Sequence, residues 1–140
     1  MSEQGLEIIE SSAQKTHEWI AQIAEVGHLE KRDAYKSLRA VLLTLRDRLP
    51  VNDAVHLGAQ LPIFLRGLFY EGWEPSKVPI KMSLEEFLKS VQEKIVAPGI
   101  IDPVRITQSV FAVTLSHVGA AEMGKIKRIF PKDMQSLWPQ

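Results

Sequence analysis

Apolar residues recur along most of this chain at intervals of three and four, the spacing of one face of an α-helix. The stretch DAYKSLRAVLLTLRDRLP, residues 33–50, shows this pattern most clearly. Asp33 is a favourable N-cap, and Pro50 closes the stretch. The apolar face between them comprises Leu38, Val41, Leu42, Leu45 and Leu49. The pattern predicts a long amphipathic helix over residues 33–50.

The same spacing predicts one helix before this segment and two short helices after it. The preceding stretch THEWIAQIAEVGH, residues 16–28, carries an apolar stripe of Trp19, Ile20, Ile23 and Val26. Two short apolar segments, 52–61 and 62–70, follow and meet at Pro62. Because proline is favoured at the first position of a helix, Pro62 is expected to begin the second of them. We expect Leu65, Leu68 and Phe69 to lie in the core.

The second half of the chain follows after a break. EGWEPSKVPIKM, residues 71–82, contains a glycine and two prolines and is typical of a linker. Ser83 and Glu86 then form a capping box at the start of a helix. APGI, residues 97–100, is typical of a turn, and Asp102 with Pro103 marks the start of a second long helix. Two short helical segments, AAEMGKIKRIF and PKDMQSLW, complete the chain.

The two halves resemble each other when the first is shifted by 69 residues. The shift places Asp33 on Asp102, Pro62 on Pro131 and Phe69 on Trp138, so caps, corner prolines and apolar positions coincide. We interpret this as an internal repeat of a helix, a long helix and two short helices. The predicted fold is all-α, with two quasi-repeated lobes of about four helices each packed as one domain. Lobe 1 covers about 12–72, the linker about 73–82 and lobe 2 about 83–138.

The block SLRAVLLTLRDRLPVNDAVHLGAQLPIFLRGLFYEGWEP, residues 37–75, resembles a known group. It is similar to the bacterial family of domain of unknown function 2267, and the resemblance extends from about Trp19 to Trp138. It departs from the family pattern at HVGAAEM, where such sequences tend to have a glycine before the glutamate. The resemblance implies an all-α, two-lobed fold and no particular activity.

Composition narrows the classes of function. The chain has 140 residues, no cysteine, and 17 basic and 17 acidic side chains. The absence of cysteine excludes disulfides and thiolate catalysis and fits a reducing compartment. Since the chain shows no signal peptide and no apolar run long enough to span a membrane, we expect a soluble cytoplasmic protein. Zero net charge argues against nucleic-acid binding, although Lys125, Lys127, Arg128 and Lys132 form one basic patch.

Three arginines are the most prominent polar candidates for a site. Arg39 and Arg46 lie seven residues apart on one side of the long helix, and Arg66 lies within an apolar run. In one interpretation they form an anion site with Tyr70 in a cleft between the lobes. In the other, which we favour, they form an arginine–carboxylate network that ties the long helix to the short-helix corner, because arginine binds carboxylates at two points.

The stretch FYEGWEP, residues 69–75, contributes two further candidates, Tyr70 and Trp73. These aromatic residues could pack the linker across both lobes, form an exposed partner patch, or stack on a ligand. We favour the first interpretation.

No catalytic or metal-binding pattern is visible in the sequence. The four histidines lack the spacing of a metal-binding helix, and there is no glycine-rich phosphate loop, so we predict no cofactor and no metal. The sequence therefore favours a non-catalytic helical module that binds another protein or a second copy of itself. The alternative is a small-ligand binder or enzyme that uses Arg39, Arg46 and Arg66.

Overall fold

The computed structural model describes residues 2–95 and 102–139, and this part of the chain is helical without any strand. The turn expected at residues 97–100 lies outside the described residues. The elements in chain order are α1 (Ser2–Gly27), α2 (Lys31–Arg48), α3 (Val51–Ala59), α4 (Ile63–Tyr70), the 3₁₀ helix η1 (Pro75–Lys77), α5 (Leu84–Lys94), α6 (Pro103–Val118), α7 (Ala120–Ile129) and the 3₁₀ helix η2 (Lys132–Leu137). The predicted all-α class is confirmed.

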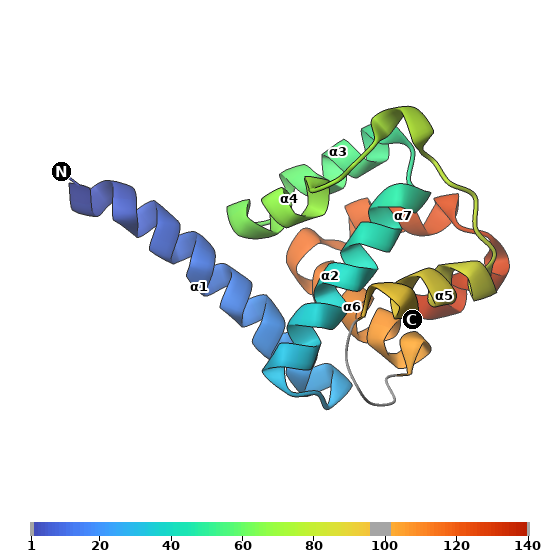
Figure 1. The fold of residues 1–140 in the computed structure, drawn as a ribbon, viewed down its shortest axis with the longest axis horizontal. Helices are drawn as coiled ribbons and strands as arrows, with labels where there is room; N and C mark the ends of the chain where they lie inside the picture. Colours follow the sequence, from blue (N-terminus) through green and yellow to red (C-terminus); the bar gives the residue numbers. More distant parts are fainter. Residues whose placement is uncertain (1, 96–101, 140) are drawn as a thin grey trace.

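The long helix α2 lies at the centre of the molecule (Figure 1). It contacts α1, α4, α5 and α6, so it links elements from both halves of the chain. Its predicted apolar face is fully buried, as are Leu65 and Phe69 of α4, and Leu68 is nearly so. One continuous core cluster contains Trp19 from the first half and Trp138 from the second. The repeat relation between the halves, and the lobe and linker boundaries, remain predictions.

Several predicted helix ends are confirmed. The Ser83 hydroxyl accepts a hydrogen bond from Glu86 N, and the Glu86 carboxylate accepts one from Ser83 N. These reciprocal bonds form the capping box. Asp102 caps α6 through Val104 N, and Pro103 is the first helical residue. Local side-chain chemistry thus determines the starts of both helices.

Other ends differ from the prediction. Helix α2 begins at Lys31 after an extended Glu30, so Asp33 lies in the first turn, where its charge complements the helix dipole, rather than at the N-cap. Pro62 is the N-cap of α4 and not its first helical residue. The segment 132–137 is a 3₁₀ helix.

The largest difference concerns α1. The sequence predicts its first helix over residues 16–28, but the helix starts at Ser2. Residues 5–15 contain no proline and only one glycine, so nothing in them interrupts the helix. The first half of α1 extends beyond the rest of the molecule (Figure 1).

Candidate functional site

A hollow lies between α1 and the corner where α3 meets α4. Its volume is about 700 Å³. Helix α1 contributes one wall, the α3–α4 corner contributes the other, and His117 of α6 also lines it. We call this hollow the α1–α4 groove. Its lining residues are Glu7, Ile8, Ser11, Ser12, Lys15, Glu18, Trp19, Ala59, Gln60, Leu61, Pro62, Ile63, Arg66 and His117.

Beside the groove wall, α1 has an exposed face that becomes buried nearer the C-terminal end of the helix. Ile23, Thr16 and Ile9 are spaced seven residues apart and therefore lie on nearly the same side of the helix. Their exposed fractions are 0% for Ile23, 6% for Thr16 and 64% for Ile9. The body of the protein thus covers this face up to about Thr16 and leaves it open toward the N-terminus. We call residues 5–14 of α1 the arm.

A hydrogen bond joins the arm to the opposite wall. Phe64 N, in the first turn of α4, donates to Ser12 Oγ over 3.1 Å. The first N–H groups of a helix have no partner within the helix, so Ser12 satisfies one of them from another element. Ile63 and Phe64 are both more than half exposed beside this contact. Leu6, Ile8 and Ile9 of the arm are exposed to a similar degree.

Arg66 lines the groove and is held by the end of α3. Its Nε donates to Gly58 O over 3.1 Å, and its Nη2 donates to Ala59 O and Leu61 O, each over 3.2 Å. These carbonyls belong to the last turn of α3 and the corner after it, where helix carbonyls lack internal partners. Arg66 is exposed, and none of its partners is a carboxylate. The predicted carboxylate partner is therefore wrong for this residue.

His117 lies at the inner end of the groove against Trp19. The two ring centres are 4.4 Å apart and the ring planes differ by 15°. His117 Nε2 lies 2.7 Å from Gln22 Oε1, and because an amide oxygen can only accept, Nε2 carries the proton in this pair. Partial burial lowers the pKa of His117, and the nearby Glu18 carboxylate opposes this shift. The imidazole is thus oriented, and burial favours its neutral form.

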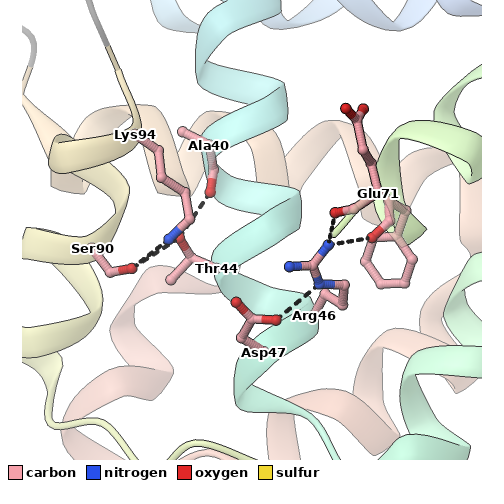
Figure 2. A network of polar contacts seen from close by, with 8 residues as sticks. Ala40, Thr44, Arg46, Asp47, Glu71, Ser90 and Lys94 are labelled. Carbon is pink, nitrogen blue, oxygen red and sulfur yellow. Dashed lines mark hydrogen bonds and ion pairs between the residues drawn. The ribbon is translucent and has the colours of Figure 1, made fainter. Parts of the chain in front are cut away.

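Arg46, the second predicted arginine, is buried away from the groove and serves the end of α4. Its Nη1 donates to Phe69 O over 3.0 Å and to Glu71 O over 2.6 Å, while its Nε pairs with Asp47 over 2.9 Å (Figure 2). This arrangement ties the long helix to the end of α4. Two of the three contacts, however, are to backbone carbonyls rather than to carboxylates.

Arg39, the third predicted arginine, lies half-buried on α2 near Lys94 of α5. Burial is the main cause of the lowered Lys94 pKa, and the charge of Arg39 contributes to the same shift. Lys94 Nζ donates to Ser90 Oγ over 2.6 Å, and Ser90 Oγ lies 3.4 Å from Thr44 Oγ1 (Figure 2). Thr44 donates its own proton to Ala40 O.

This cluster is a donor chain rather than a catalytic pair. Since the Thr44 proton is already used, Thr44 can only accept from Ser90, and the Ser90 oxygen then accepts from Lys94. A lysine acting as base would need the Ser90 proton to point toward it instead. The geometry therefore joins α5 to α2 and does not activate Ser90 as a nucleophile.

Tyr70, the last residue of α4, lies beside Trp73 in the segment that follows this helix. Their ring centres are 5.3 Å apart, and both residues are half-buried against the core. The Trp73 Nε1 atom is buried without a hydrogen-bond partner among the described residues. Neither residue lines the α1–α4 groove, and nor do Arg39 and Arg46. Of the five predicted site residues, the groove thus includes Arg66 alone.

Sequence reasoning missed two further arginines with clear roles. Arg105 of α6 donates from Nη2 to Gly27 O at the end of α1. Arg48 is buried with its guanidinium carbon 5.3 Å from the centre of the Phe130 ring, and burial lowers its pKa. Neither role has a local sequence signal, because each partner lies far away in the chain.

The described residues contain no group of three or more histidine or acidic side chains placed to hold a metal ion. Within residues 2–95 and 102–139, no helix is long and apolar enough to cross a membrane.

Comparison with known proteins identifies the family. The model of a family described as "Uncharacterized conserved protein (DUF2267)" matches residues 16–137. Because this match covers most of the chain, the protein belongs to that family, as the resemblance at residues 37–75 indicated. The match begins after the arm. A comparison with curated proteins finds none that matches this chain.

Proposed function

We propose that this protein is a helical interaction module that binds a protein partner with the arm and with the adjacent start of α4. The observation that carries the proposal is the exposure of five large apolar residues at this place. More than half of the surface of each is open to solvent: Leu6, Ile8, Ile9, Ile63 and Phe64. Soluble proteins rarely expose apolar residues of this size together unless the patch binds something.

The chemistry of the arm restricts the partner. Its exposed apolar face has the spacing of a helix that packs against another helix, since the same face is buried from Thr16 onward. The charged side chains of the arm are Glu7 and Glu10, and both are exposed. The partner that fits presents an apolar surface bordered by basic side chains, because like charges would repel it.

A photo-crosslinking experiment tests this function. A photoreactive amino acid replaces Ile9 in one variant and Val104 in a control, where it lies on α6 outside the groove lining. We expect a crosslinked protein from the Ile9 position and none from Val104. The crosslink should be lost in the double variant Glu7→Lys, Glu10→Lys. It should persist in Glu25→Lys, Glu93→Lys, which makes the same change in charge at two other exposed sites. The proposal would be contradicted if both positions captured the same amount of protein. It would also be contradicted if the Ile9 crosslink formed equally well after the arm charges were reversed.

A second candidate function is the binding of a small anion by Arg66. Three backbone carbonyls hold its Nε and Nη2 in place, and Nη1 has no hydrogen-bond partner among the described residues. A guanidinium fixed in this way is suited to carboxylate or phosphate. Titration with acetate and with inorganic phosphate, followed by NMR, should shift amide signals around Arg66 in the parent and not in Arg66→Gln. Equal shifts in both proteins would exclude this candidate.

A further inference from the structure

We propose that the partner of the arm is a second copy of this chain, in a two-fold dimer in which each arm lies along the α1–α4 groove of the other copy. This inference rests on the proposed function and names its partner. The first observation that supports the dimer is that α1 carries both surfaces, one wall of the groove and the exposed apolar face. Glu7, Ile8 and Ser11 line the groove, while Leu6 and Ile9 form the exposed face beside it.

A two-fold axis that crosses the arm therefore places the arm of each copy against the groove of the other copy. The same contact then forms twice in one dimer. In such an isologous dimer, the patch that contacts the partner is the same on both copies. The two arms run antiparallel, and the apolar face of each arm is covered by Ile63 and Phe64 of the other copy. These two residues are exposed in the single chain, where nothing else in the described part of the molecule covers them fully.

The groove also offers two basic side chains to the acidic arm of the other copy. The arm carries Glu7 and Glu10, while the groove of the facing copy offers Lys15 and Arg66 beside its own Glu7 and Glu18. Arg66 is already oriented by its contacts with α3, so little conformational freedom is lost when a carboxylate approaches. In the dimer, pairing of the arm carboxylates with Lys15 and Arg66 therefore occurs twice.

The size of the surface is adequate for a dimer. A residue as large as phenylalanine exposes roughly 200 Å² when fully solvated, so the five exposed apolar residues present about 600 Å² per copy. A stable interface buries about 800 Å² per partner, and about six-tenths of that area is apolar. The apolar patch together with the polar lining of the groove reaches this range. We infer a dimer that dissociates on dilution.

A charge-exchange experiment tests the dimer. One variant carries Glu7→Lys and Glu10→Lys, and the other carries Lys15→Glu and Arg66→Gln. Glutamine is chosen because its amide can still donate to the end of α3. In a dimer of one variant alone, each charged arm meets a groove of like charge or a groove that lacks its partner charge. The dissociation constant of that dimer should therefore be at least about ten-fold higher than that of the parent dimer. A mixture of the two variants should form heterodimers, because each then offers the charges that the other lacks.

Analytical ultracentrifugation over a wide range of protein concentrations measures these equilibria, and circular dichroism checks that every variant is folded. An apolar pair of variants provides a matched control. Ile9→Ser should dissociate the dimer without loss of helix, whereas Val104→Ser at an exposed site on α6 should leave it intact. A parent chain that stays monomeric at every concentration overturns the inference. So does a mixture that fails to associate, or an Ile9→Ser variant that dimerises like the parent.

The two proposals fail separately. If the purified chain is monomeric while the Ile9 crosslinker still captures a different protein in an arm-charge-dependent manner, the interaction module stands and the dimer is wrong. If the chain is monomeric and no crosslink forms at Ile9, both are wrong.

Discussion

The hydroxyl group of Tyr70 occupies the space that a side chain at Gly58 would need. An ideal Cβ on Gly58 would lie 2.1 Å from Tyr70 Oη and 2.6 Å from Tyr70 Cζ. The same hydroxyl lies 3.4 Å from Val55 O, and the Tyr70 ring lies against Trp73. The missing side chain at Gly58 thus allows the end of α4 to lie directly on α3 and sets the position of the aromatic pair.

Replacing Gly58 by alanine should destabilise the protein. Alanine is the better helix former by up to about 1 kcal/mol, so propensity alone predicts a gain. The added methyl group must instead displace the Tyr70 ring from its contacts, and overpacking of this kind costs about 1–3 kcal/mol. Urea denaturation of Gly58→Ala should therefore show a lower free energy of unfolding than the parent protein.

Gly67 offers the matched control for this prediction. It lies within α4, and an added Cβ would meet nothing within 4 Å. Gly67→Ala should stabilise the protein by about 0.5–1 kcal/mol. In a Tyr70→Leu background, Gly58→Ala should lose most of its cost, because the obstructing hydroxyl and ring are gone. A Gly58→Ala variant as stable as Gly67→Ala would show that the close approach does not exist in solution.

Arg46→Met should be among the more damaging substitutions in the chain. The variant leaves the buried Phe69 O and the partly buried Glu71 O without their charged donor, and losing a buried bond of this kind costs about 1.5–3 kcal/mol. Lysine should not restore the loss, since a single ammonium group cannot reproduce the planar fork that reaches both carbonyls and Asp47. Thermal and urea unfolding of Arg46→Met and Arg46→Lys check both statements.

Arg66→Gln should cost less than Arg46→Met. Arg66 also binds backbone carbonyls, but it is exposed, so water replaces the lost donors. We expect a loss of about 1 kcal/mol or less. Finding that Arg66→Gln destabilises the protein more than Arg46→Met would mean that burial does not control the strength of these contacts.

The stability of the fold should fall at mildly acidic pH because of His117. Burial lowers its pKa in the folded state below the unfolded value of about 6.5, so the unfolded chain binds the proton more readily. The contribution is therefore fully present above about pH 6.5 and is lost as the pH falls through the interval below that value. Melting temperatures of the parent and of His117→Gln across this interval should show a weaker pH dependence in the variant.

An NMR titration of the His117 ring gives an independent measurement of the same effect. Its midpoint should lie below that of a histidine in an unfolded peptide. His56→Gln, an exposed position on α3, serves as the control for the melting curves. Identical pH dependence in the parent and in His117→Gln would contradict the assignment.

The sequence predicted the parts of the fold that depend on local patterns. The face of α2 through Leu38 and Leu45, and the caps at Ser83 and Asp102, follow from periodicity and from side chains close to the helix start. The early start of α1 was missed because Leu6 and Ile9 are too few to form a stripe by themselves and become meaningful only as a continuation of the face at Thr16.

The candidate site was predicted less well, for a physical reason. An arginine in an apolar run suggests a charged partner, and carboxylates are the visible charges in a sequence. The partners of Arg46 and Arg66 are mainly helix-end carbonyls, which exist only once another helix has ended beside them. The α1–α4 groove was not foreseen either, because one of its walls is the part of α1 that the sequence did not identify as helix.

The arginines at helix ends have a consequence for how the protein folds. Arg46 closes α4, Arg66 closes α3, and Arg105 closes α1 at Gly27. The first two contacts lie within the first half of the chain, but the last requires a residue 78 positions away in the second half. Helix α1 is closed locally by Leu29 N, which donates to Ala24 O, and Arg105 adds a tie from this helix end to α6. This contact couples the two halves of the chain, so a fragment ending before residue 102 should unfold less sharply than the whole chain.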